Sequence, residues 1–293
     1  MRLEPITTTL GSEVTELDLA TEIDSLGDKI HDALVERGVL VFRDQTVPPE
    51  VHLRLAAALG ELGVPHPLYP AVEGAPQINI IRNDAANPPE AEFWHSDLTC
   101  KTDPPFASVL RGVRIPPVGG DTLWVDMRAA CSALPTSLRE RIEGRMVRNT
   151  LAHAFRFLED FGQTDRQDRL GTERADTVAE HPVIIRHPVS GTEVLFVNES
   201  FSERIVGMDD QESAAVLAEL FAFARHPRFQ MRLRWQPDTV VIWDNWTTQH
   251  FASGDHYPMH EREMHRVTVA SSRRAGLFSG TSHTSRPALF GKY

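Results

Sequence analysis

The first third of the chain alternates between helical and strand patterns of apolar residues. An apolar stripe at i, i+4, i+7 and i+8 predicts a helix that ends before Gly38, where a C-capping glycine is expected; its members are Leu26, Ile30, Ala33 and Leu34. The next segment, GVLVFRDQ (38–45), is apolar and β-branched, which predicts a short buried strand. Pro48 and Pro49 predict the start of a second helix that runs to about Leu62.

From about Gln77 onward, short apolar segments are separated by Pro, Gly, Asn and Asp. Strands that recur this often predict a mainly β protein of the sandwich or jelly-roll type with flanking helices. One strong helical pattern interrupts the series at 209–226, with Asp209 and Asp210 at its N-terminal end. The predicted strands are QINIIR, FWHSDLT, FASVLRGVRI, DTLWV, RMVRNTLA, PVIIRHP, TEVLFVN, FQMRLRW, TVVIWDN and EMHRVTVAS.

The polar stretch Leu158–His181 has little periodicity of either kind. A long segment of this type is either a surface insert or a lid over a site, and the sequence leaves both open. The chain contains no internal repeat with a period of about 20–50 residues, which excludes a solenoid or a propeller. We therefore expect a single domain over residues 1–293.

Charge and cysteine content limit the binding partners and the cellular compartment that we expect. With 30 Lys+Arg against 41 Asp+Glu, the net charge of 30 − 41 = −11 argues against nucleic acid as a partner. The two cysteines, Cys100 and Cys131, have neither metal-site nor disulfide-framework spacing, and no segment approaches the roughly 18 apolar residues of a membrane span. We expect a cytoplasmic protein without membrane association, and whether it forms a homo-oligomer stays open.

Three residues are candidates for a metal site. His95 and Asp97 in FWHSDLT are two positions apart, so on a strand both side chains would leave the same face. His250 follows the apolar segment TVVIW. Two histidines and one carboxylate on one face of an octahedral metal leave three open positions, as in non-haem Fe(II) oxygenases. From spacing alone, separate hydrogen-bonded histidines and a turn aspartate remain the alternative.

Two arginines near the C-terminus are candidates for anion binding. Arg262 and Arg266 in EREMHRVTVAS would share one face of a strand, about 13 Å apart at about 3.3 Å per residue. Buried guanidinium groups need anionic partners, and arginine pairs well with carboxylate, sulfonate or phosphate. A solvated surface strand is the alternative, but Met264, Val267 and Val269 favour partial burial.

A family resemblance covers nearly the whole chain. The segments that carry it occur in the family's order: GVLVFRDQ, HPLYP, WHSDLT, GGDTLW, HPVSGTEVLFVNESF, RWQPDTVVIWDN, TQHFA and MHRVT. With these, the chain resembles the Fe(II)/2-oxoglutarate-dependent dioxygenases of the taurine dioxygenase family. The resemblance implies a single dioxygenase domain with a double-stranded β-helix (jelly-roll) core.

The resemblance also implies roles for individual residues. The metal ligands and catalytic residues would be His95, Asp97 and His250, with Fe(II), 2-oxoglutarate and O2 as cofactor and co-substrates. Arg262 and Thr122 would bind the distal carboxylate of 2-oxoglutarate. The residues implied to contact the primary substrate are His66, Tyr69, Phe155, Phe201 and Arg266. For the aromatic residues an ordinary core position is the alternative.

The resemblance implies an oxidoreductase of sulfonate catabolism. It would hydroxylate a small anionic substrate, above all an alkyl sulfonate such as taurine, with release of sulfite, an aldehyde, succinate and CO2. Three positions depart from the taurine dioxygenase pattern: Ala91 replaces an asparagine, Cys100 an aromatic residue and Trp246 an arginine. Ala91 and Cys100 favour the alternative of an alkyl sulfate ester or another small organic acid, because they remove a polar partner for an amine and open apolar space.

Two hypotheses from other classes remain. A zinc-binding β-barrel hydrolase could use the same histidines and aspartate, but it would have no use for Arg262 or Thr122. A non-catalytic interaction domain would require the three candidate ligands to be incidental.

Overall fold

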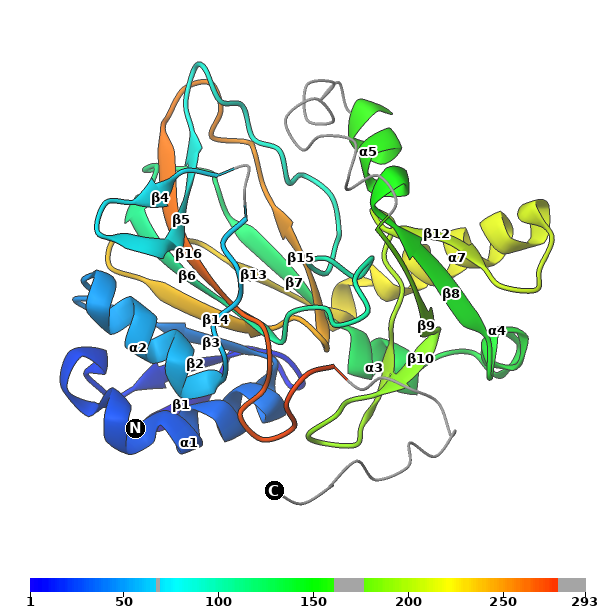
Figure 1. The fold of residues 1–293 in the computed structure, drawn as a ribbon, viewed down its shortest axis with the longest axis horizontal. Coiled ribbons are helices and arrows are strands. Elements are labelled where there is room, and N and C mark those ends of the chain that lie inside the picture. Colours follow the sequence, from blue (N-terminus) through cyan, green and yellow to red (C-terminus); the bar gives the residue numbers. More distant parts are fainter. Residues whose placement is uncertain (67–68, 161–176, 279–293) are drawn as a thin grey trace, which may run out of the picture.

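The computed structural model describes residues 1–66, 69–160 and 177–278 (Figure 1). Its larger sheet has eight strands, which in spatial order are β1 (Arg2–Pro5), β2 (Ser12–Thr15), β3 (Val39–Phe42), β14 (Val240–Asp244), β6 (Ala107–Arg114), β16 (Arg262–Val269), β5 (Ala75–Asn83) and β4 (Ala71–Val72). β2 and β3 pair in parallel, and the other neighbouring strands of this sheet are antiparallel. A smaller antiparallel sheet has the order β13 (Gln230–Leu233), β7 (Thr122–Asp126) and β15 (Thr248–Ala252).

The two sheets pack face to face. Trp124 of β7 and Trp243 of β14 lie at the centre of this interface, with their ring centroids 6.0 Å apart. The alternating residues Val240 and Ile242 of β14 point to the opposite face and join the core beneath the helices. β14 is thus buried on both faces, which explains why its sequence is a continuous apolar run.

Two helices cover the outer face of the larger sheet. The first, α1 (Leu19–Arg37), is capped by the Asp18 side chain and ends at Gly38, which has φ 69° and donates its N–H to Leu34 O. The prediction of this helix and its capping glycine is confirmed. The second, α2 (Pro49–Leu59), also packs on this face.

α2 ends at Leu59, three residues before the predicted end at Leu62. The chain turns at Gly60, where a Cβ atom would lie 1.7 Å from the carbonyl oxygen of Ser271. It then runs beside the end of β16, with Gly63 N–H donating to Thr268 O. The helix stops because this close approach of two backbones requires glycine and an extended chain.

The remaining elements pack beside the two sheets. The strands form a three-stranded sheet and a hairpin: β8 (Met146–Thr150), β9 (Val178–Pro182) and β12 (Ser202–Ile205) in the order β12-β8-β9, and β10 (Ile184–Arg186) with β11 (Glu193–Leu195). The helices are α3 (Met127–Ser132), α4 (Thr136–Ile142), α5 (Leu151–Asp160), α7 (Asp210–Ala224) and the 3-10 turn η2 (Pro227–Phe229). The predicted helix at 209–226 is confirmed as α7, which Asp209 caps.

The predicted strand RMVRNTLA is only partly correct. Its first part is β8, but helix α5 begins at Leu151, immediately after the strand. The Thr150 hydroxyl accepts a hydrogen bond from His153 N–H, which provides the helix with an N-terminal cap.

The predicted insert or lid at Leu158–His181 falls mainly on residues 161–176, which lie outside the described residues. Its two ends are the last turn of α5 and strand β9. Within the part of the chain that the structure describes, no helix is both long and apolar enough to cross a membrane.

Candidate functional site

The structure brings His95, Asp97 and His250 together. One potential ligand atom from each of the three lies within 4.8 Å of the other two. His95 Nε2 is 3.8 Å from Asp97 Oδ1, and the two imidazole centroids are 4.1 Å apart. Since 155 positions of sequence separate His95 from His250, only the tertiary fold can make this cluster.

His250 lies in β15, and the first histidine pairs with it through the backbone. His95 N–H donates to His250 O (3.1 Å) and His250 N–H donates to His95 O (2.8 Å). This single bridge extends the smaller sheet by one residue. It fixes the spacing of the two imidazole rings independently of any ligand.

The prediction of FWHSDLT as a strand is wrong beyond this bridge. Residues 97–100 form a turn, in which Leu98 has φ 52° and accepts a hydrogen bond from Lys101 N–H. Asp97 therefore reaches the histidines from the start of a turn rather than from the same face of a strand. The reason is that its backbone bonds to a side chain, that of Asn245, instead of to a neighbouring strand.

The charge state of the cluster suits a metal ion. Burial would raise the pKa of Asp97, but Arg266 and the two imidazoles outweigh it and lower this pKa to about 2. Burial, together with the His95 ring, lowers the pKa of His250 to about 3, and burial also lowers the pKa of His95. At neutral pH the cluster therefore holds two neutral imidazoles and one carboxylate, the forms that bind metal.

The hydrogen bonds of His95 and Asp97 orient their free atoms. His95 Nδ1 lies 3.1 Å from Phe93 O, a contact that needs the proton on Nδ1 and leaves the Nε2 lone pair for a metal. Ser108 Oγ donates to Asp97 Oδ2 (3.2 Å), while Oδ1 faces Arg266 and His95. The donor set and its orientation fit a divalent ion with nitrogen and oxygen ligands.

Arg262 is a buried cation with unused donors. Its side chain is 4% exposed, and its Nη2 lies 3.5 Å from the Thr122 hydroxyl, which accepts a hydrogen bond from Trp235 Nε1. Among the described residues, its Nε has no hydrogen-bond partner and no carboxylate lies within ion-pair distance. Burial lowers the pKa of Arg262 to about 10, so the group stays protonated at neutral pH and favours an anion beside it.

The second glycine of GGDTLW, Gly120, makes room for this arginine. A Cβ atom at Gly120 would lie 3.1 Å from Arg262 Cδ, and the residue has φ 71°. Its N–H donates to Asp255 Oδ1 (2.8 Å). The loop before β7 can therefore approach Arg262 only with glycine at this position.

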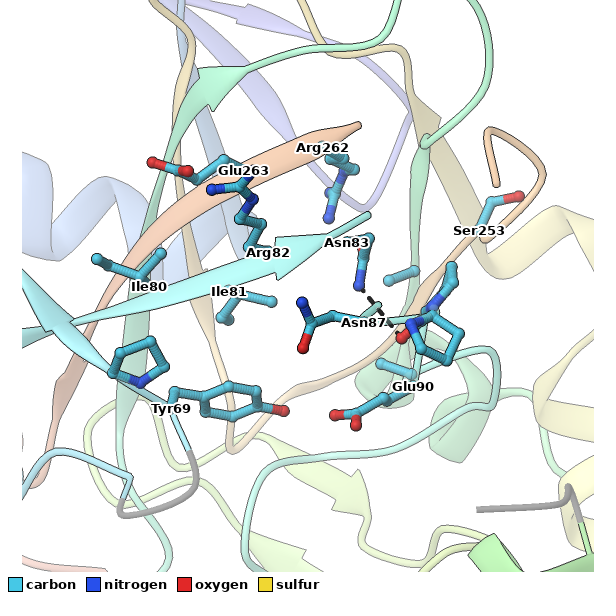
Figure 2. A pocket seen from close by; sticks show the side chains of 15 residues that line it. Tyr69, Ile80, Ile81, Arg82, Asn83, Asn87, Glu90, Ser253, Arg262 and Glu263 are labelled. Atoms are coloured by element: carbon cyan, nitrogen blue, oxygen red, sulfur yellow. Dashed lines mark hydrogen bonds between the residues drawn. The ribbon is translucent and has the colours of Figure 1, made fainter. Parts of the chain in front are cut away.

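A cavity of about 310 Å³ lies in front of Arg262. Figure 2 shows Arg262 and Asn83 extending into it from β16 and β5, with Tyr69 and Glu90 on the opposite side. Ala91, the position where taurine dioxygenase has an asparagine, also lines this cavity. The predicted co-substrate residue Arg262 and the predicted substrate residue Tyr69 thus border the same space.

The predicted substrate residues His66, Tyr69 and Arg266 converge. The Arg266 guanidinium lies 5.7 Å from the Tyr69 ring centroid, and the His66 and Tyr69 rings are 5.2 Å apart. Asn79 holds this loop: its Oδ1 accepts from His66 N–H (2.7 Å), and its Nδ2 donates to His66 O and Tyr69 O. Asn79 is also the strand partner of Arg266.

Sequence reasoning missed Asn79, although one signal was present. In QINIIRN an amide occupies an inward position of a strand whose next inward residue is Ile81. A polar side chain on the buried face of a strand must find hydrogen-bond partners, so it indicates a residue that holds neighbouring groups in place.

The predicted aromatic residues Phe155 and Phe201 are buried in two small apolar clusters, and the cluster of Phe155 lies beside His95. Phe155 packs with Phe93 and Leu151, and the Phe93 ring centroid is 4.8 Å from that of His95. Sequence reasoning missed Phe93, which precedes the first histidine by two positions.

Phe201 packs with Ala154 and with Cys100, one of the departures from the taurine dioxygenase pattern. Burial raises the pKa of the Cys100 thiol to about 12, so this residue acts as an apolar wall. Trp246, a second departure, is a core residue that donates from Nε1 to Pro104 O (3.0 Å).

Residues 2–268 match the family model described as "Taurine catabolism dioxygenase TauD, TfdA family". The chain belongs to this family. Among the relatives of this chain, an alkylsulfatase of Acinetobacter baylyi is 32% identical over 290 residues, which cover 98% of this chain and 90% of the relative. An alpha-ketoglutarate-dependent sulfate ester dioxygenase of Pseudomonas putida is 32% identical over 289 residues, 97% of this chain and 94% of the relative.

Solved structures of TauD/TfdA proteins have the same fold. A taurine dioxygenase from Burkholderia xenovorans superimposes with a TM-score of 0.78 at 30% identity, covering 96% of this chain and 95% of that one. The predicted jelly-roll core with flanking helices is therefore confirmed. Membership of the TauD/TfdA family also confirms the predicted enzyme class, a 2-oxoglutarate (alpha-ketoglutarate)-dependent dioxygenase.

Proposed function

We propose that this chain is an Fe(II)- and 2-oxoglutarate-dependent dioxygenase that hydroxylates a small sulfonate or sulfate ester. The observation that carries the proposal is the cluster of His95, Asp97 and His250, with Arg266 beside Asp97 and a second buried arginine, Arg262, bordering a cavity. A metal site with open positions needs only three protein ligands, and the two arginines supply separate sites for two anionic molecules.

We assign His95 Nε2, Asp97 Oδ1 and an imidazole nitrogen of His250 as the ligands of Fe(II). When bound, Fe(II) with 2-oxoglutarate and O2 supplies the oxidant that removes a hydrogen atom from a substrate carbon. The chain's own residues contribute placement. The backbone bridge between the two histidines and the Ser108 hydrogen bond to Asp97 hold these three residues in place.

Arg262 and Thr122 are assigned to the distal carboxylate of 2-oxoglutarate. The guanidinium Nε has no partner among the described residues, and the Thr122 hydroxyl lies 3.5 Å from Nη2, so a carboxylate can receive hydrogen bonds from both groups. The cavity in front of Arg262 gives such an anion space beside the guanidinium.

Arg266, His66 and Tyr69 are assigned to the oxyanion head group of the primary substrate. Arg266 is partly buried and lies between the Tyr69 ring and Asp97, so a sulfonate or sulfate group held there would lie close to the metal ligands. This placement determines which C–H bond faces the reactive centre. Hydroxylation at the carbon that bears the sulfonate or sulfate gives a product that breaks down to an aldehyde and sulfite or sulfate.

The apolar residues around the site favour a sulfate ester or sulfonate with a plain alkyl chain over taurine. Phe93 and Phe155 form one small cluster, Phe201, Ala154 and Cys100 form another, and Leu151 packs against both, with the Phe93 ring beside that of His95. Such a wall gains free energy from burying methylene groups, about 0.8 kcal/mol for each, and offers little to an ammonium group.

The test is a substrate panel of alkyl sulfonates, alkyl sulfate esters and small organic acids, scored by succinate formation. We expect succinate only with Fe(II), 2-oxoglutarate, O2 and a matching substrate together, with the highest kcat/KM for linear alkyl sulfates. Hydrolysis of a sulfate ester by the zinc-loaded protein without oxygen would instead support the zinc hydrolase. Absence of substrate-dependent succinate formation across the panel would contradict the proposal.

A further inference from the structure

The turn between β14 and β15 contains a buried amide that bonds to the backbone of Asp97. Asn245 is 0% exposed. Its Oδ1 accepts from Asp97 N–H (2.7 Å), and its Nδ2 donates to Asp97 O (3.0 Å) and to Pro105 O (3.0 Å). The side chain thus bonds both backbone groups of one residue and closes the loop from Asp97 to Pro105.

From this geometry we infer that Asn245 is a positioning residue, which sets the place of Asp97 and thereby the metal affinity of the site. The inference rests on the proposed function, because it assigns Asp97 as a metal ligand. Asn245 itself does not touch the proposed metal position; it acts through the backbone of the ligand.

Asp97 needs such a support because it lies outside the sheets. The turn that it begins contains Leu98 at φ 52°, a left-handed conformation that is strained for a residue with a side chain. A strand partner would normally fix the N–H and C=O of a ligand residue. Here the amide of Asn245 takes that role with the same donor and acceptor pair.

The support is part of a larger connection between two chain segments. Ser96 Oγ donates to Thr248 O (2.8 Å), next to the paired backbones of His95 and His250. Asn245, which lies five residues before His250, adds the connection to Asp97. The segment 245–250 therefore carries one proposed ligand and holds the other two in register with it.

The amide chemistry at this position is specific. Asn245→Asp keeps the size of the side chain but replaces the Nδ2 donor by an oxygen that faces the carbonyl oxygens of Asp97 and Pro105. Asn245→Ser removes the reach to at least one of these groups without adding charge. Loss of the partners that orient a metal ligand typically weakens metal binding about 10–100-fold.

A matched control is available in Asn149. It is equally buried, its Nδ2 donates to Val147 O (3.3 Å) and its Oδ1 accepts from Ser202 Oγ (2.9 Å), all within the sheet of β8, β9 and β12. Asn149→Asp and Asn149→Ser remove comparable hydrogen bonds from the core without touching the segments that carry the proposed ligands.

The experiment measures the Kd of Mn(II) by calorimetric titration and the urea midpoint for the wild type and the four variants, after circular dichroism has verified that each is folded. We expect a single Mn(II) site in the wild type. The Kd should rise about 10–100-fold in Asn245→Asp and Asn245→Ser, and stay unchanged in the Asn149 variants even where their urea midpoints fall equally.

The outcomes separate the two proposals. A wild type that does not bind Mn(II) would overturn the proposed function. A wild type that binds, with unchanged Kd in the Asn245 variants, would overturn the positioning role alone. Failure of both Asn245 variants to fold, while the Asn149 variants tolerate the same changes, would also overturn the positioning role, since the residue would then serve global stability.

Discussion

Arg266 Nη1 lies 3.6 Å from Asp97 Oδ1, so the guanidinium proposed to hold the substrate also contacts the carboxylate proposed to bind the metal. This contact contributes to the low pKa of Asp97. It also means that the substrate anion and the metal would share one charge network, in which the arginine lies between two negative groups.

We expect Arg266→Ala to raise the KM of the primary substrate about 10–100-fold, since a charge-assisted hydrogen bond contributes about 1.5–3 kcal/mol. The Kd of 2-oxoglutarate should stay nearly constant, because Arg262 lies four positions away on the same strand. Steady-state kinetics and a separate 2-oxoglutarate titration measure the two quantities.

Arg262→Ala should show the reverse pattern. Loss of the buried guanidinium should weaken 2-oxoglutarate binding by a similar factor and leave the substrate KM nearly unchanged at saturating 2-oxoglutarate. Arg114→Ala, which changes an exposed arginine of β6, serves as the control. Equal impairment of both ligands by both variants would contradict the assignment of the two arginines.

Gly120→Ala should weaken 2-oxoglutarate binding, because its methyl group would meet the Arg262 side chain at 3.1 Å. Gly144→Ala is a matched control: Gly144 has φ 69°, and a Cβ atom there would meet nothing within 4 Å. Both variants incur a left-handed backbone cost of roughly 1–2 kcal/mol, which thermal unfolding would show. Only Gly120→Ala should change the Kd of 2-oxoglutarate; equal values in the two variants would rule out this steric role.

Metal binding should tolerate mild acid. The pKa of both histidines is lowered, that of His250 to about 3, so protons compete weakly for the ligand nitrogens between pH 7.5 and 5.5. Two ordinary imidazoles with a pKa of about 6.5 would each lose about tenfold at pH 5.5, or roughly 100-fold together. A Mn(II) titration at the two pH values should show a loss of affinity well below 100-fold, and a 100-fold loss would show that the pKa values are not depressed.

His52 should make the fold sensitive to acid. Its ring is buried, Nε2 contacts Val109 O (3.0 Å), and burial lowers its pKa from 6.5 to about 4. Above pH 6.5 the His52 ring is neutral in both the folded and the unfolded state, so the unfolding free energy is fully retained. As the pH falls from 6.5 to about 4, the unfolded state takes up the proton first, and the unfolding free energy falls by up to about 3 kcal/mol.

The measurement for His52 compares urea unfolding of the wild type and His52→Gln between pH 7.5 and 4.5. Glutamine can keep a donor toward Val109 O but does not titrate. We expect the unfolding free energy of the variant to fall less steeply with decreasing pH. Parallel curves would contradict the predicted contribution of His52.

Local patterns predicted the elements that are held by local interactions. The α1 stripe with Gly38, the α7 pattern with its Asp209 cap and the inward row of β16 depend on neighbours within a few positions. The sequence missed the short helices α3 and α5, because their caps, Asp126 and Thr150, follow strand residues without a break.

Residue types and spacing made His95, Asp97 and His250 candidates, and the family resemblance assigned them as ligands, but the reason given for the pair His95 and Asp97 was wrong. Asp97 begins a turn, and its partner is an amide 148 positions away in the sequence. Asn79 and Asn245 were not recognised, since an asparagine near a turn is usually a local turn residue. Both side chains form hydrogen bonds to residues that come close only in the folded chain.

The double-sided burial of β14 has a consequence for the motions open to the site. This strand leads directly into the segment with Asn245 and His250, while Trp243 and Ile242 anchor it in opposite cores. The segment therefore cannot separate from its surroundings unless both layers come apart, which is an opening as costly as unfolding the whole protein. Small molecules must therefore reach the site by a route that leaves β14 and the layers on its two faces in place.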